Sequence, residues 1–504
     1  MSPLPLITSL ARAGALERAW VLFREGGYDR ASGDPAALAV KGRLLKDSAL
    51  REAQGSRAKV LGEAAASYAA ADRLAPQPYL RINAAACRAL AGEQAAALAD
   101  AEAVLDQLAA GRGIDETPYW LAATRAEALL IQGEVLGADA ALTEAMALDP
   151  DGYDDHASTL RQFGRLTEAL SLDSAWLDKH RPPVSVHFAG HLGIAPDQSD
   201  ALRVDVGRVL SETDAGFGYG ALAAGSDIVV AEALIARGAA LHVVLPAQID
   251  DFEALSVLPY GAEWGARFRT CLAAAQSVHV AADLGAEGYE PLATALAADL
   301  AMGAAILNAR RLESRAHQLL VIDDGAGPFG GGASTARDGE TWAQVGGTQH
   351  VLVAPRTAPV TASSGKTEGH ASRRLAALLA VSPTPGETAS PAPDHVQSCG
   401  DTSIMFFSRI ADATAHARAL AASNERLCLS GHYGLIIQTE RGVAGAALAV
   451  LDDVASMALE GTLTVSEDFA TALQLCDAGA DAQYVGDTPL RIGGSKTRLY
   501  TLTV

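Results

Sequence analysis

Two stretches decide the fold class: VSVHFAG at residues 184–190 and GFGYGALAAGSDIVVAEALIARGAALHVVLP at residues 216–246. The first is an apolar run of strand length. The second passes through a helix-like segment at residues 226–237 before another apolar run, LHVVLP, at residues 241–246. Short apolar runs that alternate with helices are typical of parallel strands joined by crossover helices. The two stretches therefore predict a doubly wound, Rossmann-like α/β domain with a parallel sheet.

The same alternation continues to about residue 355. Further strands are predicted at residues 277–282 and 317–325, and further helices near residues 200–210, 264–275 and 291–310. The sequence KHRPPV at residues 179–184 interrupts the preceding helical pattern with two adjacent prolines. We expect the α/β domain to span residues 184–355.

Residues 1–180 are predicted to be entirely helical, because apolar residues recur three and four positions apart and Gly, Asp or Pro marks the turns. One spacing pattern occurs twice, as Ala64, Tyr68, Ala71, Leu74 and Pro76, and as Ala138, Leu142, Ala145, Leu148 and Pro150. This pattern resembles the second helix of a tetratricopeptide repeat (TPR), with a further copy expected around residues 83–105. A generic alanine-rich bundle is the alternative. Stacked repeats suit a protein partner and carry no catalytic groups.

The C-terminal part is predicted to form a third domain. Residues 356–373 are rich in Thr, Ser, Ala and Gly and predict a linker. Residues 374–504 mix predicted strands and helices, which is typical of an α+β domain. The length of 504 residues agrees with about three domains.

Composition limits the possible functions. The chain has 60 acidic and 39 basic residues, and its net charge of −21 disfavours direct DNA or RNA binding but allows a small nucleotide. The sequence shows neither an uninterrupted apolar run of about 18 residues nor a secretory signal pattern at its start, so we expect a cytoplasmic protein without membrane contact. Five scattered cysteines without a CxxC pair predict no disulfide framework and no metal site. No cofactor is expected.

Two glycine-containing loops follow predicted strands, where open parallel sheets bind their ligands. The first loop contributes Gly190, His191 and Gly193, and the second contributes Gly220, Gly225, Ser226 and Asp227 before a helix that carries Glu232. The glycines allow close backbone approach, and a helix N-terminus favours an anion. His191 could donate to a phosphate. The alternative is that these glycines only turn the chain.

The same residues carry a resemblance that spans about residues 184–355. Together with WGARF at residues 264–268, they resemble the SLOG superfamily of Rossmann-like nucleotide-sensing and nucleotide-processing domains, in the form that bacteria fuse to helical repeats. The resemblance implies a nucleotide-derived ligand at the two loops. Arg267 could then contact a phosphate, or it could form an ion pair on the helix surface.

Some SLOG members cleave an N-glycosidic bond with a glycine-rich stretch that precedes an acidic helix. Residues 330–335, GGGAST, followed by Glu340, are similar to that stretch but depart from it in spacing and order. A glycine loop that covers the end of the sheet is the alternative.

The last domain resembles the C-terminal half of class III nucleotidyl cyclase domains, through RLCLSGHYGLI, LEGTLTVSEDFATAL and QYVGDTPLRIGGSKTRLYTL. The preceding stretch, SCGDTSIMFFSRIADATAHARAL, resembles the hairpin and following helix that carry the second metal aspartate of that family, which would fall on Asp401. The first would fall near Val381, where no carboxylate is present, and the transition-state Asn and Arg would fall near Ala449 and Asp453. Since an acid in place of that arginine repels developing phosphate charge, we expect a catalytically inactive module that supports assembly into a homo-oligomer.

Three functions remain open at this point. The leading hypothesis is a cytoplasmic sensor in bacterial signalling that binds a nucleotide-type ligand in the SLOG-like domain and a protein partner through the helical repeats, without catalysis. The first alternative is a hydrolase of a nucleotide or NAD-type N-glycosidic bond, with Glu232 or Glu340 stabilising the ribosyl cation and His191 handling a proton. The second is a protein-interaction scaffold.

Overall fold

The computed structural model describes residues 3–51, 54–282, 291–323, 325, 333–359, 372–386, 389–424, 426–439, 442–477, 479–491 and 496–502. The chain divides into two compact units. Unit 1 comprises Met1–Pro182 with Arg311–Glu313, and unit 2 comprises Pro183–Arg310 with Ser314–Val504.

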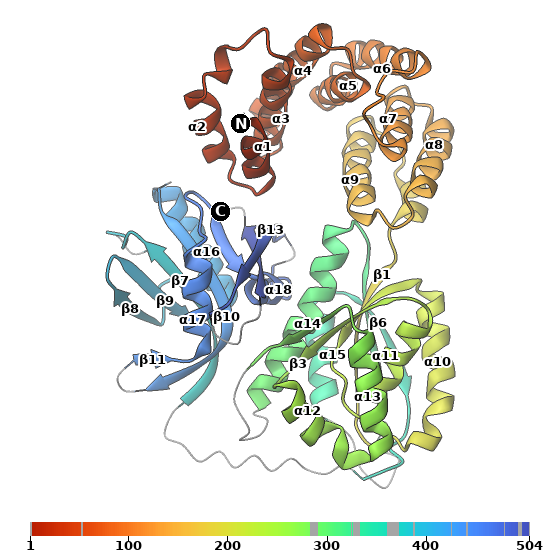
Figure 1. The fold of residues 1–504 in the computed structure, drawn as a ribbon, viewed down its shortest axis with the longest axis vertical. Coiled ribbons are helices and arrows are strands. Elements are labelled where there is room, and N and C mark those ends of the chain that lie inside the picture. Colours follow the sequence, from red (N-terminus) through yellow and green to blue (C-terminus); the bar gives the residue numbers. More distant parts are fainter. Residues whose placement is uncertain are drawn as a thin grey trace. The chain divides into compact units, whose positions relative to one another are not determined.

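Unit 1 is an array of α-helices in which successive helices from α1 to α8 pack against each other and α9 packs against α5 and α7 (Figure 1). Its helices are α1 (Leu4–Arg12), α2 (Leu16–Glu25), α3 (Pro35–Arg51), α4 (Gln54–Leu74), α5 (Pro78–Ala91), α6 (Gln94–Ala109), α7 (Pro118–Ile131), α8 (Val135–Leu148) and α9 (Tyr153–Ala169). The repeated spacing pattern falls on α4 and α8, and its alanines, Tyr68 and Leu142 are buried on both helices. The prediction of helices throughout this part of the chain is confirmed.

A buried charge network crosses the interfaces of α4, α5 and α6. Arg81 on α5 contacts Asp72 on α4 at 2.6 Å and Asp100 on α6 at 3.0 Å. Arg88 also pairs with Asp100. Both carboxylates are almost fully buried, so the arginines supply the charge partners that make this burial tolerable.

The first part of unit 2 contains a six-stranded parallel sheet in the order β4-β3-β2-β1-β5-β6. Its strands are β1 (Val184–Gly190), β2 (Ala215–Gly220), β3 (Ala240–Leu245), β4 (Ser277–Val280), β5 (Ala316–Ile322) and β6 (Thr348–Val353). The parallel sheet and the four predicted strands β1, β3, β4 and β5 are confirmed. Strand β2 was missed because three of its six residues are glycine, a composition typical of turns.

Helices cover both faces of this sheet, as its apolar strands require (Figure 1). One face packs against α10 (Ser199–Glu212), α11 (Ser226–Ala236), α12 (Ile249–Ser256) and α13 (Ala262–Ala274). The other packs against α14 (Pro291–Arg311) and α15 (Ala333–Val345). The predicted helices near residues 200–210, 226–237, 264–275 and 291–310 are therefore confirmed.

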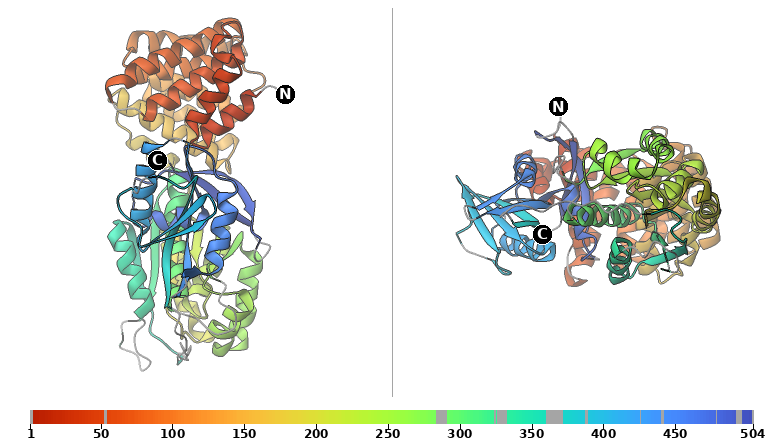
Figure 2. Two further views of the ribbon diagram at one scale, coloured as in Figure 1. Left: turned by 90° about the vertical axis from the view of Figure 1, so that its left-hand side faces the viewer. Right: turned by 90° about the horizontal axis from the view of Figure 1, so that it is seen from below.

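The second sheet of unit 2 is mixed, with the order β13-β14-β12-β10-β7-β9-β8 and β11 beside β10. Its elements are β7 (Ser372–Ser382), β8 (His395–Cys399), β9 (Thr402–Phe407), α16 (Ile410–Ser423), β10 (Cys428–Thr439), β11 (Gly442–Ala444), α17 (Ala446–Ala455), β12 (Leu463–Ser466), α18 (Glu467–Leu473), β13 (Ala482–Pro489) and β14 (Lys496–Leu502). Strands β10 and β12 are parallel, and the other pairs are antiparallel. Figure 2 shows this sheet from two further directions.

Helix α14 joins the two sheets of unit 2 through a shared core. Its residues Leu296 and Leu300 are buried together with Leu379 of β7 and Phe407 of β9, while its Met302 packs beside Tyr219 of the parallel sheet. Among the described residues, α14 is the helix long and apolar enough to cross a membrane, but 67% of its most apolar window is buried inside the protein. Core helices of soluble proteins have the same property.

Candidate functional site

The candidate site lies at the carboxyl edge of the parallel sheet, where strands β1, β2, β5 and β6 end. Strand β1 is the first in the chain and lies inside the sheet, between β2 and β5. Chain connections therefore run outward from β1 in both directions, which defines a topological switch point between β1 and β5. Open α/β sheets bind ligands in the crevice at such points.

The two glycine loops meet at this edge. A Cβ atom on Gly190 would collide with the side chain of Ser226, and Gly225 has φ +105°, which disfavours any other residue. The Ser226 hydroxyl donates to the carbonyl oxygen of His191 at 3.0 Å. The glycines are therefore needed to bring the end of β1 against the start of α11.

Asp227 is buried at the N-terminal turn of α11. Its Oδ1 atom accepts from the backbone N–H of Gly190 at 2.9 Å, and Oδ2 accepts from the N–H of Ala223 at 3.3 Å. Burial raises the pKa of Asp227 to about 7, while the two backbone N–H groups act to lower it and Asp338 adds to the increase. The carboxyl group thus joins both loops and can exchange a proton near neutral pH.

His191 holds a third segment onto the same loop. Its Nδ1 atom lies 2.8 Å from the carbonyl oxygen of Leu192, and Nε2 lies 2.7 Å from that of Ala354, just beyond β6. The N–H groups of Thr357 and Ala358 donate to the carbonyl oxygen of Gly193 at 2.8 Å. Both ring nitrogens of His191 face backbone carbonyl oxygens, so a ligand phosphate would have to displace one of these contacts.

Gly220 lies at the end of β2, where a Cβ atom would meet the carbonyl oxygen of Phe188. The structure thus brings the predicted residues Gly190, His191, Gly193, Gly225, Ser226 and Asp227 together at one edge, with Gly220 at the adjoining strand end.

Glu232 and Arg267 form their own pair away from these loops. Arg267 makes a bidentate contact with the Glu232 carboxylate, with Nε–Oε1 and Nη2–Oε2 distances of 2.7 Å. Its guanidinium also lies 4.1 Å from the ring centroid of Trp264. Of the two expectations for Arg267, the ion pair is the one that the structure shows.

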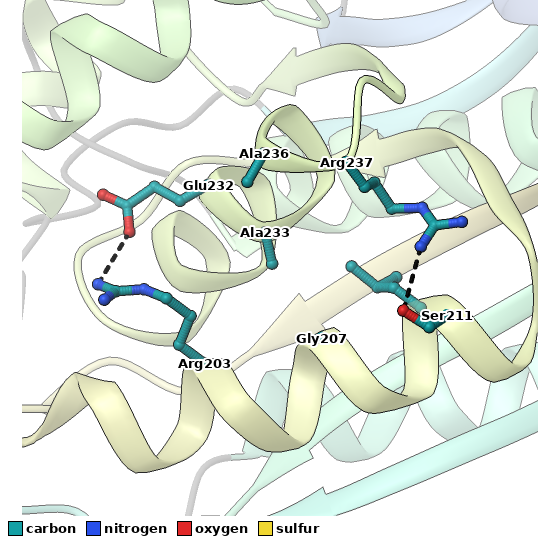
Figure 3. A pocket seen from close by; sticks show the side chains of 8 residues that line it. Arg203, Gly207, Ser211, Glu232, Ala233, Ala236 and Arg237 are labelled. Carbon is teal, nitrogen blue, oxygen red and sulfur yellow. Dashed lines mark hydrogen bonds and ion pairs between the residues drawn. The ribbon is translucent and has the colours of Figure 1, made fainter.

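A groove of about 420 Å³ separates α10 from α11 (Figure 3). Its lining residues are Arg203, Gly207, Leu210, Ser211, Glu232, Ala233, Ala236 and Arg237. Figure 3 shows an ion pair between Arg203 and Glu232, 3.4 Å long, and a hydrogen bond between Arg237 and Ser211. The groove lies between helices and contains Glu232 but none of the loop residues.

Buried acidic residues were missed from the sequence. Asp338 on α15 is buried, and burial raises its pKa to about 6 although Arg337 opposes this effect. Arg337 donates to Asp299 of α14 at 2.8 and 3.0 Å. Glu340, the predicted acid of this helix, is exposed instead, and residues 330–332 of the predicted glycine stretch lie outside the described residues.

Asp323 and Arg356 were also missed. Residues Ile322 and Val353 are paired neighbours at the ends of β5 and β6, and Asp323 and Arg356 follow them within three positions. The Asp323 side chain is fully buried and that of Arg356 is 10% exposed, with Nε and Oδ2 3.7 Å apart. Neither atom has a hydrogen-bond partner. A charged residue directly after an apolar strand is the available signal, but the composition of residues 356–373 predicts a linker and hides it for Arg356.

The four positions that correspond to catalytic residues of the cyclases are spread over different elements of the part of the chain that contains the second sheet. Val381 is buried in β7, and Asp401 is exposed in the turn between β8 and β9. Ala449 and Asp453 lie on α17, where Asp453 pairs with Arg491. In the described part of the chain, no three His, Cys, Asp or Glu side chains are grouped so that they could hold a metal ion.

Comparisons with known proteins identify similar solved structures. No protein-family model and no curated protein matches the sequence. One similar structure is an adenylate/guanylate cyclase/hydrolase from Silicibacter pomeroyi, with 14% identity over 26% of this chain and 98% of that chain and a TM-score of 0.23. A second is the adenylyl cyclase CyaB from P. aeruginosa, with 9% identity over 26% of this chain and 95% of that chain and a TM-score of 0.22. A third is the catalytic core of a rhodopsin-guanylyl cyclase with converted specificity in complex with ATPalphaS, with 10% identity over 27% of this chain and 99% of that chain and a TM-score of 0.23.

Proposed function

We propose that the protein is a signalling sensor that binds a nucleotide-type ligand at the carboxyl edge of the parallel sheet, without catalysis. The observation that carries the proposal is the Asp323–Arg356 pair, whose buried Oδ2 and Nε atoms lack hydrogen-bond partners at the ends of β5 and β6, beside the switch point. Buried polar atoms are normally satisfied, so unsatisfied ones in a ligand-binding position favour a polar ligand. The start of α11 adds a helix N-terminus to the same edge.

The other parts of the chain would transmit or use the signal. In this proposal, the TPR-like helices of unit 1 bind a protein partner, and the second sheet of unit 2 supports assembly of several copies. The core shared by α14 and both sheets would couple the ligand site to the second sheet.

The test is a titration calorimetry panel on the purified chain with NAD, ADP, ADP-ribose, cyclic mononucleotides and cyclic dinucleotides. We expect at least one of them to bind, to be recovered intact, and to lose binding in Gly225→Trp. Gly238→Trp is the matched control, because Gly238 also has a positive φ but faces open space beyond α11. Thermal melts of both variants check that they fold. If no nucleotide binds, the proposal is wrong.

A second candidate function is N-glycosidic hydrolysis of the same class of ligand. Asp227 and Asp338 favour it, because carboxyl groups with pKa values of about 7 and about 6 can donate a proton near neutral pH. Chromatography of the recovered ligand separates the two functions. A cleaved product that disappears in Asp338→Asn would establish the hydrolase and exclude a pure sensor.

A further inference from the structure

Asp323 and Arg356 form an ion pair that is buried but incomplete. Two other arginine–carboxylate pairs in this unit, Arg267–Glu232 and Arg337–Asp299, have contacts of 2.7 and 2.8 Å. The Nε–Oδ2 distance of 3.7 Å is about 1 Å longer and outside hydrogen-bond range. Since an unsatisfied buried charge is costly, a group that bonds to both atoms would stabilise the pair.

The carboxylate of Asp323 is held so that one oxygen remains available. Its Oδ1 atom accepts from the backbone N–H of Gly325 at 3.1 Å, whereas Oδ2 faces Arg356 without a hydrogen-bond partner. The missing group must therefore donate to Oδ2 and accept from the Nε–H of Arg356.

A hydroxyl group meets both requirements with a single atom. Because the two protein atoms are 3.7 Å apart, a hydroxyl oxygen between them can lie about 2.8 Å from each. A phosphate at this point would be repelled by Asp323, and an ammonium group by Arg356. The electrostatics therefore select a neutral group that both donates and accepts.

Resting on the nucleotide-binding function proposed above, we propose that Asp323 and Arg356 form a subsite for the ribose hydroxyls of the ligand. Asp323 accepts a hydrogen bond from a ribose hydroxyl, and Arg356 donates one to it. Gly190 ends β1, the neighbour of β5, so the two glycine loops lie beside the subsite, and the rest of the ligand would lie against them.

The first test compares ribose-containing and deoxy probes on the unaltered protein by titration calorimetry. The probes are ADP, 2′,3′-dideoxy-ADP, ribose 5-phosphate and 2-deoxyribose 5-phosphate. We expect ADP to bind about tenfold or more tightly than its dideoxy analogue, because a site built for a hydroxyl rejects a ligand that leaves its polar groups unpaired.

The second test uses Asp323→Asn, Arg356→Gln and the double variant, with Arg208→Gln at an exposed position of α10 as control. We expect each of the three site variants to weaken ADP about tenfold and to bind dideoxy-ADP as the unaltered protein does. This non-additivity identifies the hydroxyls as the partner of the pair. Removal of both charges in the double variant avoids leaving one buried charge alone, which protects folding, and thermal melts verify it.

The outcomes separate this subsite from the proposed function. If ADP and dideoxy-ADP bind equally tightly, the ribose subsite is wrong, while nucleotide binding stands. The ribose subsite is also wrong if Asp323→Asn weakens the binding of ADP and of dideoxy-ADP equally, because that result indicates recognition of a base edge instead. If ribose 5-phosphate binds and ADP does not, and the variants abolish this binding, the subsite stands and the nucleotide function fails. If none of the probes binds, the ribose subsite is wrong, and the calorimetry panel with NAD, ADP-ribose and cyclic nucleotides decides the nucleotide function.

Discussion

At the residue scale, Asp227 joins the two loops of the candidate site. Its two oxygens accept from Gly190 and Ala223, one from each loop. Asp227→Ala should lower the free energy of unfolding by about 1–3 kcal/mol, because two backbone N–H groups lose their acceptors. Urea denaturation measures this change. Asp250→Ala, at an exposed position in the first turn of α12, is the control. An equal effect of both substitutions would contradict the structural role of Asp227.

His279 on β4 is paired with Asp468 on α18 at 2.8 Å. Burial lowers the pKa of His279, but the Asp468 carboxylate and the nearby Glu467 outweigh it and raise the pKa to about 9. Because the folded-state pKa exceeds the ordinary value of 6.5, the pair stabilises the protein fully below pH 6.5. This stabilisation is lost as the pH rises through 9.

The thermal midpoint of the chain should therefore fall between pH 6.5 and pH 9. His279→Gln should flatten this part of the profile, whereas His395→Gln on the edge strand β8 should leave it unchanged. Asp468 and the buried His432 face the same cluster. Burial acts to raise the pKa of Asp468, but His279 outweighs it and lowers that pKa, and burial lowers the pKa of His432, so both groups titrate outside this window. A profile that His279→Gln does not alter would contradict the assignment.

At the element scale, the close contact of α14 with α18 depends on one glycine. A Cβ atom on Gly303 would collide with the backbone carbonyl of Thr471, which cannot rotate away. Gly303→Ala should destabilise unit 2 by about 1–3 kcal/mol through overpacking. Gly207→Ala on α10 meets open space and should stabilise the helix by about 0.5–1 kcal/mol. Chemical denaturation should show that the free energy of unfolding falls in Gly303→Ala and rises in Gly207→Ala. If Gly303→Ala does not lose stability, the close contact of α14 with α18 is wrong.

The interfaces of α4, α5 and α6 depend on Arg81. Arg81→Ala should lower the stability of unit 1 by about 3–5 kcal/mol, because it leaves the buried carboxylate of Asp72 without a charge partner and that of Asp100 with Arg88 alone. Arg125→Ala removes an exposed pair with Glu144 and should change stability by less than about 1 kcal/mol. Thermal melts of the two variants provide the comparison, and similar midpoints would contradict the network's role.

Strands and helices were predictable where local patterning is strong. Strands β1, β3 and β5 are short, mainly apolar runs, and the helices α11 and α14 are recognisable from apolar and small residues over a helix-length stretch. Strand β2 was not predictable, because its glycines are explained only by contacts such as Gly218 against Leu234. The same limit applies to the choice between Asp338 and Glu340. They are two positions apart, and tertiary packing alone buries the first and exposes the second.

At the scale of the whole molecule, the ion pair between Asp323 and Arg356 could not be predicted from the sequence. It depends on β5 and β6 lying side by side, which follows from the strand order rather than from local composition. The glycine loops were predictable, because loops after apolar strands of a parallel sheet share one edge. The shared core of α14 with both sheets was not, because an apolar helix does not reveal how many partners it has.

The most direct test of the central claim is amide hydrogen exchange of the full chain with and without a saturating concentration of the nucleotide that the calorimetry panel identifies. The account predicts added protection at residues 190–195, 221–227 and 354–358, the segments that meet at the carboxyl edge of the parallel sheet. Protection confined to the helices of unit 1 or to the second sheet, or no change in any segment, would contradict it.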